Sequence, residues 1–101
     1  MKKTKTRPYD SARYLDTPEA IAAYLTEALK TEEPSFIASA LGTVARAKGM
    51  SGVARKAGLS RENLYRSLDG HTKPEFDTII RVLGAVGLTL SANPKPRSKA
   101  S

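Results

Sequence analysis

The spacing of helix start and stop signals constrains the fold of this chain more than any other sequence feature. Thr17 followed by Pro18 is a typical helix start, because threonine caps the first turn and proline fits its first position. Apolar residues then recur at helical spacing until the pattern breaks after Lys30. The segment predicts a helix from about Pro18 to Lys30, with an apolar face made of Ile21, Tyr24, Leu25, Ala28 and Leu29.

Signals of the same kind predict four more helices. A second helix starts at Pro34 and is closed by Gly49, because glycine accepts positive φ without a steric clash. Two short helices lie on either side of the segment 58–60, and a last helix runs from Pro74 to Gly87. Tyr24 and Phe36 are expected in the core. The apolar faces of the second and last helices are Phe36, Ile37, Leu41, Val44, Ala45, Phe76, Ile79, Ile80, Leu83 and Val86.

The segment after the last helix, Leu88-Thr89-Leu90-Ser91, alternates apolar and polar residues and therefore predicts a short strand. One isolated strand is not stable in a monomer. It would have to pair with the N-terminal segment around Arg7–Tyr9 or with a second chain.

A chain of 101 residues fits one domain. We predict a flexible basic arm at 1–8, a single helix-turn-helix domain at 9–92 and a disordered basic tail at 93–101. The tail contains only charged, small and proline residues besides Asn93, so it cannot bury enough apolar surface to offset its ordering entropy. The predicted fold class is all-α: five helices with a short C-terminal strand.

Residues 50–70 have the spacing of a helix-turn-helix. A small residue, Ala54, is followed after four positions by Gly58, and the apolar residues Leu59 and Leu64 come one and six positions later. The small side chain lets the two helices approach, the glycine reverses the backbone, and the two leucines fill the angle between the helices. The position three after Leu64, often apolar in such motifs, is Ser67, and the neighbouring Leu68 can fill its space.

The second helix of this motif has a polar outer face at its N-terminal half, the end that enters a major groove. Arginine can form two hydrogen bonds with a guanine edge, and asparagine two with an adenine edge. Ser51 begins the preceding helix and can present its hydroxyl and backbone amides to a phosphate. The residues predicted to contact DNA are Ser51, Ser60, Arg61, Glu62, Asn63, Tyr65, Arg66 and Lys73.

Two residues of this region have alternative roles. Tyr65 either contacts DNA or packs on the next loop, and His71 is either an exposed loop residue or a phosphate contact. Seven basic residues between Arg46 and Lys73 stand against Glu62 and Asp69, so the stretch has a local charge of +5.

The net charge of +7 is unevenly distributed. It lies entirely in residues 1–7 and 95–101, whereas residues 8–94 sum to zero. Within that body, residues 8–45 carry −4 and residues 46–94 carry +4. A neutral body with an acidic half and a basic half indicates more than one partner.

Composition also excludes several classes of protein. The chain has no cysteine and one histidine, so disulfides, thiolate sites and histidine-cluster metal sites are excluded. Its longest apolar runs are too short for a membrane span, and its basic N-terminus lacks the apolar segment of a secretory signal. We expect a cytoplasmic protein without a membrane association, a cofactor or a catalytic residue, because no nucleophile-base pair or paired carboxylates are recognisable.

Four stretches between Tyr9 and Ala92 carry a likeness to a known family. They are residues 14–21, residues 37–42 leading to 45–50, the string Gly58-Leu59-Ser60-Arg61-Glu62-Asn63-Leu64-Tyr65, and residues 73–78 with Gly87-Leu88. In these stretches the chain resembles the addiction-module antidote proteins, which are HigA-like antitoxins with a lambda-repressor-like helix-turn-helix domain of the XRE type.

This resemblance implies that the protein inhibits a cognate RelE/HigB-like ribonuclease toxin, represses its own operon by binding double-stranded operator DNA, and acts as a homodimer. The polar helix face and the unpaired strand favour the last two independently. Because such ribonucleases are basic, we predict that the acidic N-terminal half faces the toxin. The alternative is a stand-alone XRE-type transcriptional regulator without a toxin partner. The acidic side chains in question are those of Glu19, Glu27, Glu32 and Glu33.

Overall fold

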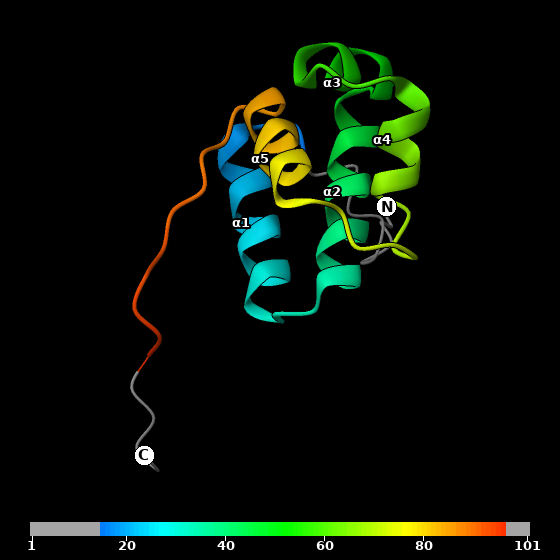
Figure 1. The fold of residues 1–101 in the computed structure, drawn as a ribbon. Helices are drawn as coiled ribbons and strands as arrows, with labels where there is room; N and C mark the ends of the chain where they lie inside the picture. The colour runs from blue at the N-terminus through cyan, green and yellow to red at the C-terminus, as the bar shows by residue number, and fades with distance from the viewer. Residues whose placement is uncertain (1–14, 97–101) are drawn as a thin grey trace, which may run out of the picture.

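A computed structural model describes residues 15–96 of the chain, and this part folds into five helices (Figure 1). All five predicted helices are confirmed, and the last begins at Phe76 rather than at Pro74. None of the five has the length and apolar composition of a membrane span. The helices are α1 (Pro18–Lys30), α2 (Pro34–Lys48), α3 (Met50–Ala57), α4 (Arg61–Ser67) and α5 (Phe76–Ala85).

The helix ends follow the local chemistry of the sequence. The Thr17 side chain accepts a hydrogen bond from the Ala20 backbone N–H at 3.1 Å, and Ser60 Oγ accepts one from the Asn63 N–H at 3.0 Å. Each bond satisfies a backbone donor that has no partner within its helix. At the end of α3, Gly58 adopts a left-handed conformation with φ of 74°, which glycine accepts more readily than any other residue.

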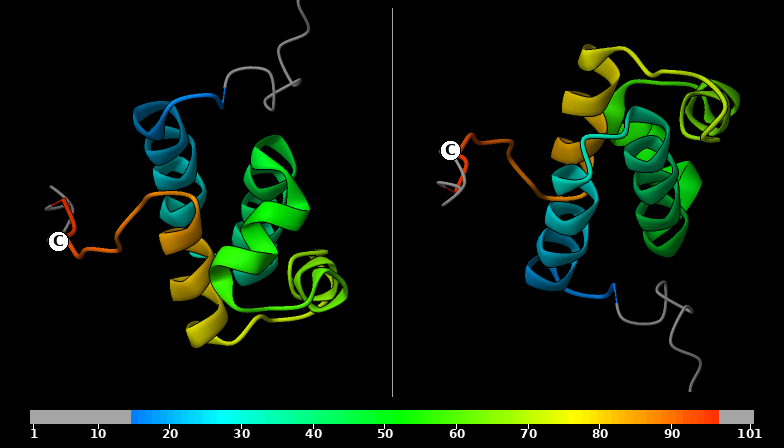
Figure 2. Two further views of the ribbon diagram at one scale, coloured as in Figure 1. Left: turned by 90° about the horizontal axis from the view of Figure 1, so that it is seen from above. Right: turned by 90° about the horizontal axis from the view of Figure 1, so that it is seen from below.

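The core lies where α1 and α2 pack against each other and α3 packs between α4 and α5. Both views in Figure 2 show α5 beside α1, with α4 on the far side of α2. The small size of Gly42 on α2 brings α2 close to the end of α4, because a Cβ at Gly42 would lie 2.7 Å from the Leu68 carbonyl oxygen. The largest fully buried side chains are those of Ile21, Leu41, Leu64, Val44 and Val82.

Some apolar residues assigned to the core lie at its edge. Phe36 was expected inside but is 54% exposed, whereas Tyr24 is half-buried against the core. On α5, Phe76 is 67% and Ile80 is 42% exposed. The buried face of α5 is centred on Val82, Leu83 and Val86, and Phe76 and Ile80 lie toward the edge of that face. Periodicity identifies a helix face, but it does not say how far neighbours cover the edges of that face.

The predicted strand at 88–91 is not found, and no strand occurs anywhere in residues 15–96. The Leu88 N–H donates to the Leu83 carbonyl at 2.8 Å, but residues 89–96 form no backbone hydrogen bond with another described residue. A strand needs a neighbouring strand, and the described chain offers none. The alternative pairing segment, 7–9, lies outside the described residues, as do the predicted arm at 1–8 and residues 97–101 of the tail.

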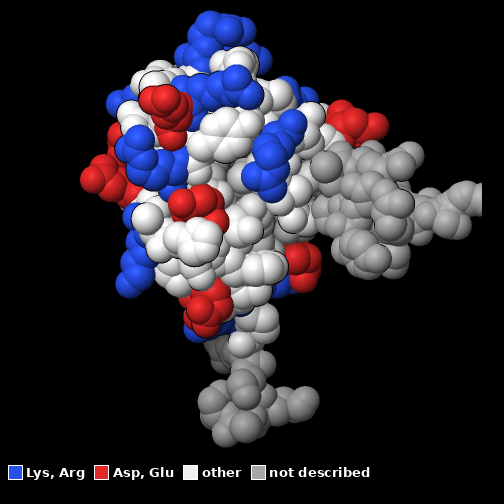
Figure 3. Space-filling model, turned by 90° about the vertical axis from the view of Figure 1, so that its right-hand side faces the viewer, with Lys and Arg blue, Asp and Glu red and all other residues white. Residues whose placement is uncertain are grey.

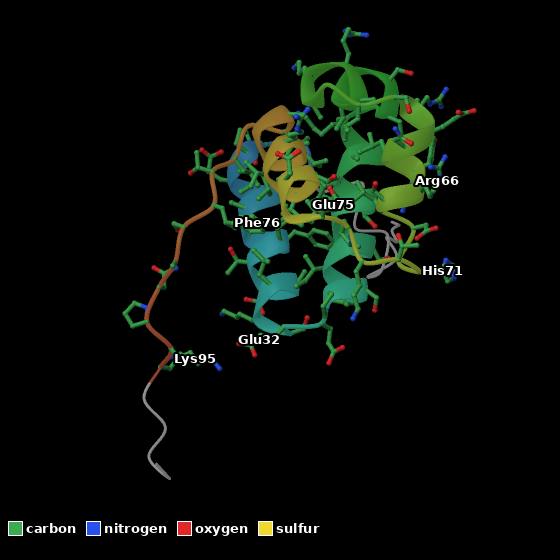
Figure 4. All side chains as sticks on the ribbon, in the orientation of Figure 1. Glu32, Arg66, His71, Glu75, Phe76 and Lys95 are labelled. Atoms are coloured by element: carbon green, nitrogen blue, oxygen red, sulfur yellow. The ribbon has the colours of Figure 1, made fainter. Side chains whose placement is uncertain are left out.

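Beyond Leu88 the chain continues in an extended form on the α1 side of the molecule (Figure 1). Near its described end, Lys95 Nζ lies 3.3 Å from Glu32 Oε2 in the turn between α1 and α2. Figure 4 labels both residues at the lower end of the molecule. The ion pair places the extended segment next to the turn that follows α1.

Candidate nucleic-acid interface

The helices α3 and α4 are held at a fixed angle by the short segment that joins them. The Leu59 N–H donates to the Ala54 carbonyl at 2.9 Å, and the Gly58 N–H donates to the Arg55 carbonyl at 3.2 Å. Ala54 and Leu64 are buried, and Leu59 is half-buried. The two helices therefore meet through the residues that the sequence pattern assigned to this contact.

Leu68 is also buried, at 3% exposure, whereas Ser67 is only half-buried. Leu68 thus occupies the inward position that Ser67 leaves without an apolar side chain, as the sequence suggested. Its carbonyl oxygen faces Gly42 of α2, so the end of α4 is fixed against α2 as well as against α3.

The outer face of α4 carries polar side chains that contact one another. Arg66 Nη1 donates a hydrogen bond to Asn63 Oδ1 at 3.2 Å. The Arg61 guanidinium lies over the Tyr65 ring, with its carbon 5.5 Å from the ring centroid, a distance that allows a cation–π interaction. These contacts restrict the side chains to fewer conformations, which lowers the entropy lost when they bind a ligand.

The Tyr65 ring also borders the rest of the fold. It lines an open pocket of about 260 Å³ together with residues of α2 and the start of α3, and it is 42% exposed. One side of the ring is thus near protein and part of it is open to solvent. Both roles assigned to Tyr65 from the sequence are compatible with this position.

All eight residues predicted to contact DNA are exposed, but they lie on three segments. Ser60 caps α4, and Arg61, Glu62, Asn63, Tyr65 and Arg66 lie on it. Ser51 is in the first turn of α3, and Lys73 is in the loop before α5. No hydrogen bond or ion pair among the described residues joins Ser51 or Lys73 to α4, so the cluster that the structure brings together is the one on α4.

The loop after α4 is organised by Asp69. Its carboxylate accepts a hydrogen bond from the His71 backbone N–H at 2.8 Å, and this bond holds the pKa of the Asp69 carboxyl below its ordinary value. The Thr72 hydroxyl donates to the Arg66 carbonyl at 3.2 Å. The His71 side chain is exposed, with Nδ1 3.8 Å from Asp69 Oδ2.

The electrostatics of this side of the molecule are mixed but basic around α3 and α4. Figure 3 views the side on which α4 lies in Figure 1 and shows a band of Lys and Arg across its top, with acidic side chains among and below them. The basic residues between positions 46 and 73 are all exposed, namely Arg46, Lys48, Arg55, Lys56, Arg61, Arg66 and Lys73.

Arg81 was not identified from the sequence. It lies on α5 and contacts the end of α3, directly before the segment that leads into α4. Its Nη1 donates to the Ala57 carbonyl at the end of α3 at 3.3 Å, and its Nε donates to Asp77 at 2.9 Å. The i, i+4 spacing of Asp77 and Arg81 was the available signal for the ion pair. The bond to Ala57 joins residues 24 positions apart, which no local pattern indicates.

Comparison with known proteins gives two findings. Residues 5–94 match the model of a family described as "Probable addiction module antidote protein". A protein of Haemophilus influenzae that carries the description "Uncharacterized protein" is 44% identical over 82 residues, covering 81% of this chain and 84% of that relative. No solved structure was found to match the chain.

Proposed function

Because the chain belongs to the family of probable addiction module antidote proteins, which implies a toxin partner, we propose that it is a DNA-binding antitoxin. It neutralises a RelE/HigB-like ribonuclease toxin and represses its own operon by binding operator DNA as a homodimer. Within this proposal its domain is a HigA-like, lambda-repressor-like helix-turn-helix of the XRE type, located in the cytoplasm and without a catalytic role.

The observation that carries the DNA-binding part is the exposed polar face of α4, held on a buried Leu64. Leu64 has no exposed surface, so the helix is fixed to the core on one side while Arg61, Asn63 and Arg66 extend from the other. A short helix fixed in this way at the corner of a small domain fits the width of the major groove.

The side chains on this face match the chemistry of base edges. Arg61 has a guanidinium that can donate two parallel hydrogen bonds to guanine. Asn63 accepts from Arg66 at 3.2 Å through Oδ1, and this oxygen retains a second lone pair for the amino group of adenine. Each such bidentate contact contributes about 1–3 kcal/mol of discrimination between bases.

The remaining predicted contacts would fix the orientation of the protein on the backbone. Ser51 lies in the first turn of α3, whose N-cap residue Gly49 makes no side-chain cap. The first amides of α3 can therefore donate to a phosphate. Lys73 and the other exposed bases contribute attraction that does not depend on sequence.

The hypothesis that the acidic N-terminal half faces a basic toxin is supported by the exposure of its glutamates. Glu19, Glu27, Glu32 and Glu33 are all exposed on α1 or on the turn after it. However, Glu27 pairs with Lys30 at 3.3 Å and Glu32 pairs with Lys95 at 3.3 Å. The acidic surface offered to a basic toxin is therefore weaker than the sequence count of acids suggests, and Glu19 and Glu33 contribute most of it.

The DNA-binding proposal is tested by a mobility-shift assay on the DNA upstream of the gene, with random DNA as competitor, over a salt series. We expect the wild-type protein to prefer the upstream DNA and the Arg61→Ala variant to lose that preference. Lys30→Ala, which removes one positive charge from α1, is the matched control and should retain it. Equal binding of wild type to both DNAs would contradict the proposal.

The stand-alone regulator is the competing function, and it differs only in the absence of a toxin. Co-expression with the neighbouring open reading frame separates the two. An antitoxin should co-purify with a short basic product and restore growth that this product inhibits. Reversal of Glu19, Glu27, Glu32 and Glu33 to lysine should weaken that complex, and unchanged binding would exclude the acidic surface.

A further inference from the structure

The guanidinium of Arg61 is held in a different way from those of three other arginines in the structure. Arg46, Arg66 and Arg81 each donate a hydrogen bond to an oxygen atom of a nearby residue. Within residues 15–96 the Arg61 guanidinium donates no hydrogen bond and forms no ion pair, and it lies over the Tyr65 ring, with its carbon 5.5 Å from the ring centroid. Arg61 is therefore held by an aromatic face instead of an acceptor.

An aromatic face and an oxygen atom leave a guanidinium in different states for a ligand. A hydrogen bond to an oxygen uses one of the five N–H donors, whereas an aromatic face attracts the charge through its quadrupole. Arg61 therefore keeps the two parallel N–H groups that a guanine edge requires. Its side chain is also restricted before DNA arrives, so less rotamer entropy is lost on binding.

The Tyr65 ring is in turn placed by the fold. It directly follows Leu64, which has no exposed surface, and it lines the pocket of about 260 Å³ beside Gly42 and Met50. The ring is 42% exposed. A tyrosine side chain has only two χ angles and loses little entropy when it is placed in this way. The ring therefore connects Arg61 to the folded body through a short and stiff side chain.

The second polar pair on α4 is arranged differently. Arg66 uses one of its donors on Asn63 Oδ1 at 3.2 Å. Arg61 lies in the first turn of α4, at the helix end that enters a major groove. Of the two arginines on this helix, Arg61 is thus the one that has both a complete set of donors and the position for a contact with a base.

We propose that Tyr65 is a positioning residue whose ring holds the Arg61 guanidinium ready to contact a guanine in the major groove. Tyr65 then acts through Arg61 and not through a DNA contact of its own. This inference rests on the proposed DNA binding and adds to it a division of roles within α4. Residues at i and i+4 are neighbours on a helix surface, so the pair forms without any change in the backbone.

Methylation interference on the DNA upstream of the gene tests the inference with the full chain. Dimethyl sulfate methylates guanine at N7, one of the two acceptors that an arginine uses in the major groove. With the wild-type protein we expect methylation of a guanine in each half-site to block binding. Arg61→Ala should abolish this block, and Tyr65→Ala should reduce it at the same guanine and at no other.

Equilibrium binding of these variants to the unmodified DNA gives the magnitudes. Arg61→Ala should weaken binding roughly tenfold or more, and Tyr65→Ala should weaken it roughly two- to fivefold. The double variant should bind no more weakly than Arg61→Ala alone, because the ring then has no guanidinium to hold.

Two further substitutions of Tyr65 are matched controls. Tyr65→Phe keeps the aromatic face and should bind within roughly twofold of wild type. Tyr65→Leu fills much of the same space without an aromatic face and should behave like Tyr65→Ala. Circular dichroism and thermal denaturation of each variant show that the domain still folds, and Tyr65→Leu takes the place of Tyr65→Ala if the alanine variant does not.

Three results would each overturn the inference and leave the proposed function standing. Additive losses in the double variant would assign Tyr65 a DNA contact of its own. A loss in Tyr65→Phe as large as that in Tyr65→Ala would assign the effect to the hydroxyl group, and wild-type binding by Tyr65→Leu would assign it to packing. A wild-type protein without preference for the upstream DNA over random DNA would overturn the proposed function, and this inference with it.

Discussion

Arg81 of α5 donates a hydrogen bond through Nη1 to the carbonyl oxygen of Ala57, the last residue of α3, at 3.3 Å. The acceptor belongs to the last turn of α3, where carbonyl groups have no partner within the helix. Through this bond α5 fixes the position of the α3 end, directly before the turn that leads into α4.

Replacing Arg81 with alanine should therefore lower the free energy of unfolding by about 0.5–1.5 kcal/mol, the usual contribution of one hydrogen bond. Urea denaturation measures this change. Asp77→Ala is the control, because it removes the ion pair at 2.9 Å but leaves the bond to Ala57 possible. Since that pair is largely exposed, its loss should matter less, and an equal effect of both substitutions would refute a distinct role for the Ala57 contact.

Ser60→Ala should lower the unfolding free energy by about 1 kcal/mol, because it removes the side-chain acceptor at the start of α4. The bond lost is the one from the Asn63 N–H at 3.0 Å. Ser51→Ala is the matched control, since the N-cap of α3 is Gly49 and no side-chain cap is formed there. Thermal denaturation of both variants gives the comparison, and equal melting temperatures would contradict the capping role of Ser60.

Gly42→Ala and Gly84→Ala should have opposite effects on stability, although both residues lie inside helices. A Cβ at Gly42 meets the Leu68 carbonyl oxygen at 2.7 Å, and such overpacking typically costs about 1–3 kcal/mol. A Cβ at Gly84 meets nothing within 4 Å, so helix propensity should stabilise that variant by about 0.5–1 kcal/mol. Urea denaturation of each variant tests the sign of each change.

Asp69 should make folding stability fall at acid pH. Its pKa is lowered in the folded chain, first by the hydrogen bond from the His71 N–H. A lowered pKa means that the stabilisation is present above the unfolded value and is lost as pH falls through the folded one. The unfolded value is near 3.8, so the loss lies below that pH.

Asp69→Asn should accordingly reduce the decline of the urea midpoint as the pH falls from about 4 to about 2, because asparagine does not take up a proton there. Its side-chain oxygen can still accept from the His71 N–H, so the loop is retained. Glu19→Gln removes a carboxylate of α1 far from this loop and serves as the control. An unchanged acid slope in Asp69→Asn would show that this carboxylate does not control it.

The helices were predictable because their ends are determined by neighbours in the sequence. Thr17 caps α1 through a residue three positions away, and Gly49 closes α2 with φ of 102°. The composition of the α4 surface was predictable for the same reason, since Leu64 marks the inner side and the polar residues around it lie outside. Such signals span one or two turns and need no knowledge of the rest of the fold.

The features that could not be predicted from the sequence depend on contacts between residues far apart in the chain. The 67% exposure of Phe76 depends on how the other helices pack against α5, and the bond between Arg81 and Ala57 joins residues 24 positions apart. The expected strand at 88–91 has the right alternation, but a strand requires a neighbour that an alternating pattern cannot supply. The α4 surface was likewise predicted without its internal contacts, such as that of Arg66 with Asn63.

The seven residues of α4 are too few to form a stable helix in water by themselves. The helix exists because Leu64 is buried and because both of its ends are bound to the rest of the domain. Its binding surface and the folded core are therefore a single cooperative unit. If the proposed DNA binding holds, a mutational scan scored only by that binding would identify Leu64, Gly42 and Arg81 together with the proposed contact residues. Only a parallel measurement of folding would separate the two groups.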